Sequence, residues 1–198
     1  MNEHRDDLAS KTGMWLFLFT EMLLFAGLFI VYSVYRYKNA QAFHLAAHEL
    51  SVFIGTLNTA ILLISSATVA MSISALQKKN KKLALTLLFV TISLGLLFLV
   101  NKYFEWGEKI HHQVYPGSEV IVNRGHGDVL FFGLYFFMTG LHALHIIIGL
   151  VFLGFIVAYI RRGKVTPDNH VLMENAGLYW HLVDMIWIFL FPLFYLIT

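Results

Sequence analysis

Long apolar stretches alternate with short charged segments along the whole chain. Five apolar stretches stand out, each bounded by charged or turn residues, and they cover about residues 12–35, 50–76, 83–106, 129–160 and 175–197. As helices rising about 1.5 Å per residue, all five can cross a hydrocarbon core of roughly 30 Å, and the fourth is long enough to tilt or protrude. The pattern predicts an all-α fold, in which residues 1–198 form a single membrane domain of five transmembrane helices.

The basic residues indicate how such a bundle is oriented, because an odd number of spans places the termini on opposite sides. Nine of them fall on the side of the N-terminus: Arg5, Lys11, Lys78, Lys79, Lys81, Lys82, Arg161, Arg162 and Lys164. Five fall on or near the other side: Arg36, Lys38, Lys102, Lys109 and Arg124. Cytoplasmic loops carry the excess of lysine and arginine, so we predict the N-terminus inside and the C-terminus outside.

Composition agrees with a membrane protein and excludes several other classes. Hydrophobic residues make up 58% of the chain and charged residues only 13%, which is far from the composition of a soluble domain. A net charge of +2 is too small to indicate nucleic-acid binding. The chain has no cysteine, which excludes disulfides, iron–sulfur clusters and cysteine-ligated copper.

Several ionisable residues lie inside the predicted spans, where a charge costs about 2.5–3.5 kcal/mol on insertion scales and therefore faces protein rather than lipid. Glu21 in the first span has two interpretations: a carboxyl kept protonated or hydrogen-bonded against a neighbouring helix, or a proton-relay or lipid-headgroup site. His181 and Asp184 in the last span are three residues apart and share one helical face. The predicted topology puts them in the inner half of the bilayer, where we expect a polar clasp between helices.

Three further polar positions are predicted to serve packing. Asn58 belongs to a second span rich in small and hydroxylic residues, which allow close helix approach and hydrogen bonds between helices. Lys102 and Glu105 are an i,i+3 pair near the outer end of the third span. We expect an interfacial ion pair there, with the lysine reaching toward the membrane surface.

The histidines raise the question of a metal centre. His142 and His145 share one face of the fourth span, where they could ligate haem or metal, or donate to a backbone carbonyl or a carboxyl on the next helix. With His44-x3-His48 and His111-His112 they loosely resemble the histidine boxes of membrane di-iron enzymes. Metal ligands must converge, yet His142 lies some 20 Å along its helix from the outer loops that hold the others. We therefore predict no metal centre in this chain.

Five stretches, in order, carry a resemblance to a known family. They are Gly13-Met-Trp-Leu-Phe-Leu-Phe-Thr-Glu21, Leu57-Asn-Thr-Ala-Ile-Leu-Leu-Ile-Ser-Ser66, Phe98-Leu-Val-Asn-Lys-Tyr-Phe-Glu105-Trp, Tyr135-Phe-Phe-Met-Thr-Gly-Leu-His142-Ala-Leu-His145 and Tyr179-Trp-His-Leu-Val-Asp184-Met-Ile-Trp187. Over nearly the whole chain the pattern resembles subunit III of the haem–copper terminal oxidases, the cytochrome c and quinol oxidases. The chain starts where the third helix of the seven-helix members would, so it is similar to the five-helix bacterial forms.

The resemblance implies a non-redox subunit in the bacterial cytoplasmic membrane, with no catalytic centre of its own. Haems and copper would lie in partner subunits, subunit I being packed directly against this chain and subunit II belonging to the same complex. Glu21 matches the membrane carboxylate of the family, and bound phospholipid, support of assembly and sustained proton uptake by subunit I are further expectations. The alternatives are an accessory protein of nitric oxide reductase with the same fold, a stand-alone di-iron or haem enzyme, and a small proton-linked transporter.

Overall fold

The computed structural model describes residues 2–197, with side chains from residue 8 onward, and this part of the chain is helical without strands. Seven helices follow one another: α1 Asn2–Lys38, α2 Ala40–Ala47, α3 Val52–Gln77, α4 Lys81–His111, α5 Glu119–Arg124, α6 His126–Arg161 and α7 Val171–Tyr195. Five of them, α1, α3, α4, α6 and α7, are long and apolar enough to cross a membrane. This result confirms the predicted all-α bundle with five spans.

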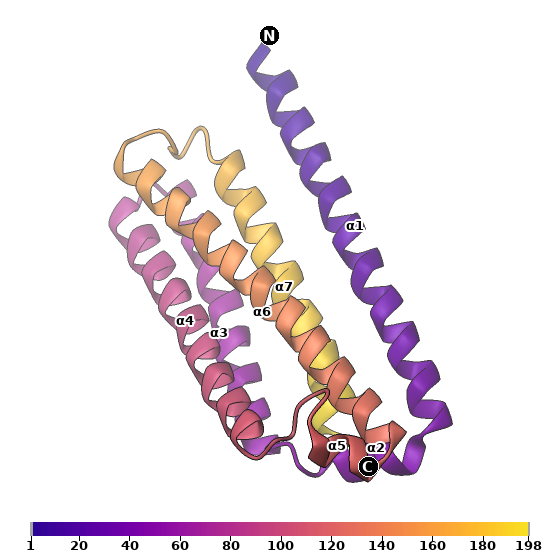
Figure 1. Cartoon of the computed structure of the whole chain (residues 1–198). Helices are drawn as coiled ribbons and strands as arrows, with labels where there is room; N and C mark the ends of the chain where they lie inside the picture. The colour runs from indigo at the N-terminus through magenta and orange to yellow at the C-terminus, as the bar shows by residue number, and fades with distance from the viewer. Residues whose placement is uncertain (1, 198) are drawn as a thin grey trace.

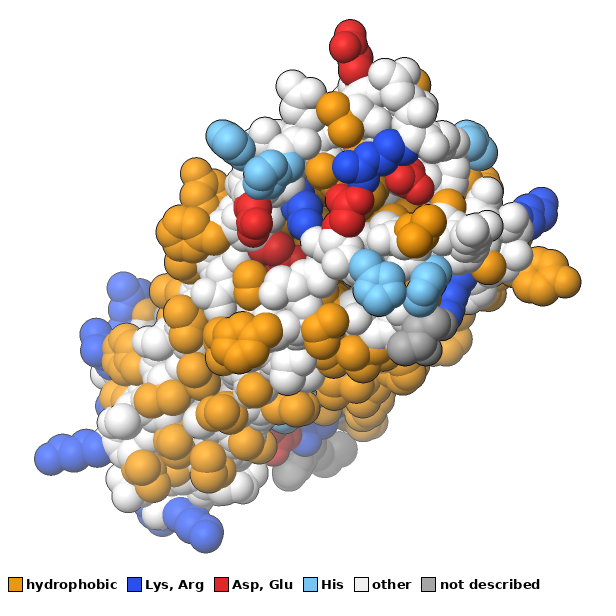
Figure 2. Space-filling view, turned by 90° about the horizontal axis from the view of Figure 1, so that it is seen from below, with side chains coloured by type: hydrophobic (Ala, Val, Ile, Leu, Met, Phe, Trp, Pro, Cys, Tyr) orange, Lys and Arg blue, Asp and Glu red, His pale blue; other side chains and the backbone are white. Residues whose placement is uncertain are grey.

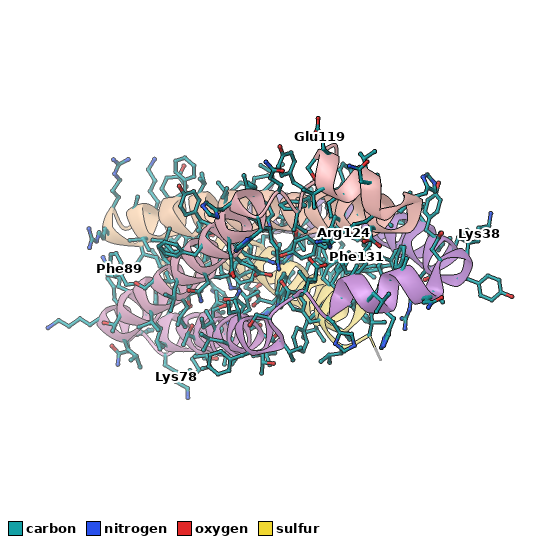
Figure 3. The ribbon with its side chains drawn as sticks, turned by 60° about the horizontal axis from the view of Figure 1, so that its bottom comes forward. Lys38, Lys78, Phe89, Glu119, Arg124 and Phe131 are labelled. Atoms are coloured by element: carbon teal, nitrogen blue, oxygen red, sulfur yellow. The ribbon has the colours of Figure 1, made fainter. Side chains whose placement is uncertain are left out.

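The five long helices run alternately up and down, and the two ends of the bundle differ in their side chains (Figure 1). We call the end with the α3–α4 turn and the α6–α7 connection the basic end; it includes Lys78, Lys82 and Arg162. The opposite end carries α2, α5 and five histidines, and we call it the histidine end: His44, His48, His111, His112 and His126. In Figure 3, Lys78 and Phe89 lie toward the basic end, whereas Lys38, Glu119 and Arg124 lie toward the histidine end.

Side-chain caps mark the starts of α3, α4 and α5, which differ from the limits of the apolar stretches. The side chain of Asn80 accepts a hydrogen bond from the backbone N–H of Leu83 at 3.1 Å, so α4 begins at Lys81, before its first apolar residue. Ser118 caps α5 in the same way through Ile121, which produces a short helix inside a connection predicted to be a loop. The short helix α2 was not predicted either, and α1 extends through the charged segment that precedes the first apolar stretch.

Helices α3, α4, α6 and α7 form the packed body of the protein, and Trp180 of α7 lies at its centre. Its indole ring covers Gly95 of α4 and Gly149 of α6, where an added Cβ would come within 2.8 Å of ring carbons at each position. The indole N–H donates to the Ser65 hydroxyl of α3 at 3.0 Å. One fully buried side chain therefore contacts all three neighbouring helices, and two glycines make room for it.

Helix α1 is packed differently from the other four. In Figure 1 it stands beside α6 and α7 and diverges from them toward the N-terminus. Only 11% of the residues in its most apolar stretch are buried, compared with 56% for α7. The closest packing is near the histidine end, where Tyr32 is buried against Phe43 of α2 and Phe194 of α7 and its hydroxyl donates to the Leu193 carbonyl. Most of the surface of α1 is left for lipid or another protein.

Candidate functional site

The carboxyl of Glu21 meets the imidazole of His145, and this pair joins α1 to α6. The Oε2 of Glu21 lies 2.9 Å from Nε2 of His145, and the Nδ1 of the same ring lies 2.7 Å from the Leu141 carbonyl. Both histidine nitrogens are thus engaged, one by a carboxyl on the next helix and one by a backbone carbonyl. The Phe25 ring packs edge-on against His145 at 5.4 Å between centroids, and Tyr179 of α7 donates to the His145 carbonyl at 3.2 Å.

The Glu21–His145 pair sits at the rim of the packed body rather than in its core. The Glu21 side chain is 17% exposed and the His145 side chain is 8% exposed. A partly enclosed carboxyl–imidazole pair in an apolar layer can hold one proton between its two members, and it also ties a poorly packed helix to the body. The geometry is compatible with both predicted interpretations of Glu21, the structural one and the proton-linked one.

His142 is placed near His145 in sequence, but its surroundings are entirely different. It is fully buried between the rings of Phe98 and Trp187, at 5.5 and 5.2 Å between centroids. Neither ring nitrogen has a hydrogen-bond partner within the described residues. His145 thus has two hydrogen-bond partners, whereas His142 is enclosed by aromatic rings.

Lys102 and Glu105 form the predicted ion pair, at 3.1 Å, but the expectation that the lysine reaches out of the protein toward the membrane surface is wrong. Both side chains are buried, at 3% and 2% exposure, and a lysine so placed does not reach toward the surface. Tyr135 of α6 and Tyr195 of α7 enclose the pair. The reason is that the third span continues as a helix to His111, well beyond its predicted end, so Lys102 lies a few turns inside the bundle.

The two tyrosines complete the hydrogen bonding of this buried pair. Oε1 of Glu105 accepts from the hydroxyls of both Tyr135 and Tyr195, while Nζ of Lys102 donates to the same hydroxyls at 3.2 and 2.7 Å. The ammonium group also lies 5.1 Å from the centre of the Trp187 ring. A buried ion pair is tolerated only when its remaining donors and acceptors are satisfied, and here α4, α6 and α7 each supply a member of the network.

The last helix does form a polar contact across the bundle, through His181 rather than through both predicted residues. Nδ1 of His181 lies 2.6 Å from the Ser66 hydroxyl of α3. Asp184 is buried, and neither of its carboxyl oxygens has a hydrogen-bond partner within the described residues. Between α3 and α4, the Asn58 amide oxygen accepts from Asn101 at 2.9 Å.

Sequence reasoning identified one member of most of these contacts and missed the other. The missed partners are one amide and two phenol side chains: Asn101, Tyr135 and Tyr195. A signal was available for Tyr135, because it shares a helical face with Thr139 and His142 at spacings of four and seven residues. No such periodicity links Tyr195 to Glu105, since they are 90 residues apart and meet only in the folded bundle.

The histidines predicted not to converge remain distributed over the molecule. His44 lies on α2 and His48 just beyond its end, His111 and His112 lie at the end of α4, and His142 lies inside the bundle. No group of three or more histidine, cysteine, aspartate or glutamate side chains in the described part of the chain is arranged to hold a metal ion.

The sequence matches a known protein family over nearly its whole length. The family described as Cytochrome c oxidase subunit III matches residues 5–198. The cytochrome c oxidase subunit 3 of Thermostichus vulcanus is 32% identical over 187 residues, which cover 94% of this chain and 86% of that protein.

The relatives are named as subunits of different kinds of oxidase, and their chains differ in length. The probable quinol oxidase subunit 3 of Staphylococcus saprophyticus is 27% identical, over 95% of this chain and 89% of that protein. The cytochrome c oxidase subunit 3 of the dugong, Dugong dugon, is 33% identical over 93% of this chain but only 68% of its own, longer sequence. With five membrane-spanning helices and a match over nearly its full length, this multi-pass membrane protein belongs to the cytochrome c oxidase subunit III family.

Proposed function

We propose that the chain is the non-redox subunit III of a bacterial haem–copper terminal oxidase in the cytoplasmic membrane. In this role it packs against subunit I, alongside subunit II, and supports assembly, lipid binding and sustained proton uptake while the partner subunits hold the haems and copper. The observation that carries the proposal is the family match over residues 5–198, with relatives named as subunit 3 of cytochrome c and quinol oxidases.

The intramembrane contacts support a scaffold rather than a redox centre. Glu21, His145, Lys102 and Glu105 are each engaged by another side chain of this chain at hydrogen-bond distance. Side chains held in this way stabilise helix–helix contacts, whereas a haem or di-iron site needs ring nitrogens or carboxyls directed at a common point. These contacts disfavour the stand-alone haem or di-iron enzyme.

The proposal includes a face for the partner subunit, and the packing of α1 supports it. Helix α1 exposes large apolar side chains, among them Trp15, Phe19 and Leu23, along a surface that the other helices of this chain leave uncovered. In a membrane such a surface is suited to lipid and to a neighbouring subunit alike. The Glu21–His145 pair lies behind it, where it can respond to lipid or to subunit I.

Co-purification tests the proposal. A tagged chain isolated from its own membranes in mild detergent should carry a haem-containing subunit, and the preparation should reduce oxygen. In Glu21→Gln the complex should still assemble and turn over, with activity that decays sooner during continuous turnover. Recovery of the chain with nitric oxide reductase subunits, or proton flux in liposomes that contain this chain alone, would contradict the proposal.

A further inference from the structure

The histidine end contains two imidazoles that face each other on one short helix. His44 lies on α2 and His48, four positions later, is the residue that follows its last turn, where the backbone is still helical, with φ −63° and ψ −18°. Their Nε2 atoms are 3.4 Å apart, and the two ring planes are nearly perpendicular, at 85°. The pair is reachable from outside the protein, because His48 is exposed and His44 is half-buried. Figure 2 looks onto this end and shows histidines on its surface.

The distance between the two nitrogens matches the edge of a metal coordination tetrahedron. With zinc–nitrogen bonds of about 2.0–2.1 Å and a tetrahedral angle, two imidazole nitrogens on one ion are about 3.3–3.4 Å apart. The observed 3.4 Å is within reach of a long N–H···N hydrogen bond between the free rings, and it is also suitable for a shared ion.

Helix α2 is held rigidly enough to keep this arrangement. Phe43, the residue before His44, is fully buried and packs edge-on against Phe131 of α6 and Tyr32 of α1, at 5.4 and 5.6 Å. That anchor fixes the rotation of α2 about its axis. Both histidines consequently point to the same side of the helix before any ion arrives.

We propose that His44 and His48 form a binding site for a first-row divalent transition ion, for which Zn²⁺ is the natural probe. The two imidazoles supply two ligands through Nε2, and water completes the tetrahedron. The neighbouring Glu49 does not contribute, because its carboxyl is paired with Arg124 of α5. This site goes beyond the proposed function and does not depend on it.

The site is expected to be weak compared with structural zinc sites, which have four protein ligands. Binding through Nε2 of His44 leaves the proton on Nδ1, and that nitrogen is buried without a hydrogen-bond partner within the described residues. Missing outer partners of this kind lower metal affinity by about 10–100-fold. The ion should therefore exchange readily and be removable by chelators.

Equilibrium dialysis of the full-length chain in detergent, purified through a tag without histidines and stripped by a chelator, tests the site. Wild type should bind Zn²⁺, and the His44→Gln/His48→Gln variant should lose one bound ion per chain. The matched control is His111→Gln/His112→Gln, which removes another pair of neighbouring histidine rings. The centroids of these rings are 5.4 Å apart, but the two residues are consecutive in sequence rather than four positions apart. It should retain that ion.

Co²⁺ provides a second readout that does not depend on a variant. A tetrahedral Co²⁺ ion gives intense visible absorption bands and an octahedral one gives weak bands, so the wild type should show the intense bands, and added Zn²⁺ should abolish them. The proposal is overturned if wild type binds no ion, if only weak octahedral bands appear, or if both double variants lose the ion equally. It is also overturned if His44→Gln/His48→Gln retains the ion.

Discussion

Helices α1 and α7 both lie against α6, yet they are held by different means. In the last helix, more than half of the most apolar stretch is buried. It is held by Trp180, by the two glycines beneath that ring and by hydrogen bonds to α3. The first helix is mostly exposed and relies on a few defined contacts, of which Glu21–His145 is the one in mid-span. Helix α7 therefore has many attachments, whereas the Glu21–His145 contact is a principal attachment of α1.

This difference separates two kinds of role in one small protein. The body formed by α3, α4, α6 and α7 has a dense interior that encloses both satisfied polar groups, as in the Lys102–Glu105 network, and buried ones without a hydrogen-bond partner within the described residues, such as His142 and Asp184. Helix α1 leaves most of its apolar surface uncovered by the other helices, although Leu18, Phe25 and Tyr32 are buried against them. Substitutions in the body should act on stability, and substitutions on α1 should act on attachment and on the partner complex.

The largest effect on the body is expected from Lys102→Met. The substitution leaves Glu105 buried with two tyrosine hydroxyls and no counter-charge, and removing one member of a buried pair typically costs about 3–5 kcal/mol. The free energy of unfolding, measured by denaturant titration in detergent with helical circular dichroism as the signal, gives this cost. A change no larger than that of the exposed control Lys82→Met would show that the pair contributes little.

Gly149→Ala should have the next largest effect. The new methyl group would lie 2.8 Å from the Trp180 ring, and such overpacking usually costs about 1–3 kcal/mol. Gly133→Ala on the same helix is the matched control, because a Cβ there meets no atom within 4 Å. The difference in the free energy of unfolding between the two variants isolates the contact. Equal values would contradict the central role of Trp180.

A smaller effect is expected from breaking the attachment of α1. Hydrogen bonds between membrane helices average about 0.6 kcal/mol, with a maximum near 1.7, so Glu21→Gln and His145→Gln should each weaken stability modestly. A double-mutant cycle should show positive coupling between them. Limited proteolysis near residue 39 should be faster in Glu21→Gln than in the lipid-facing control Met22→Leu. Additive effects in the cycle would show that the two side chains do not interact.

The smallest effect should come from the exposed ion pair of Glu49 and Arg124 at the histidine end. Exposed pairs contribute about 0.2–1 kcal/mol and are screened by salt. Arg124→Gln should therefore lower stability slightly at low ionic strength and not measurably at high ionic strength. Thermal unfolding at two salt concentrations measures this difference, and an effect that persists in high salt would indicate a packing role for the arginine stem.

The sequence alone predicted the membrane-spanning helices but not the partners of their polar side chains. Apolar length alone predicted five spans, since a bilayer demands about 20 apolar residues from each helix wherever it packs. The cost of a buried charge indicated that Glu21, His181 and Asp184 must face protein. It could not identify their partners, because Glu21 and His145 are 124 residues apart and only the packed bundle brings them together.

Errors arose where local and tertiary effects compete. Lys102 was predicted to reach the membrane surface because lysines near helix ends usually do, but a helix that continues to His111 and two tyrosines from other helices keep it inside. Helices α2 and α5 were missed because they are short, with eight and six residues, and lie in the connections between the long apolar stretches. Phe43, Ala46 and Ala47 of α2 and Ile121 of α5 become buried in the folded bundle.

The haem content of this chain, measured apart from its partners, tests the central claim most directly. Tagged protein is produced in cells that lack the subunit I gene and purified in mild detergent, and haem is quantified by the pyridine haemochrome method against protein concentration. The account predicts a folded chain with no stoichiometric haem, and recovery of haem in the preparation once subunit I is restored. One haem per isolated chain would contradict it.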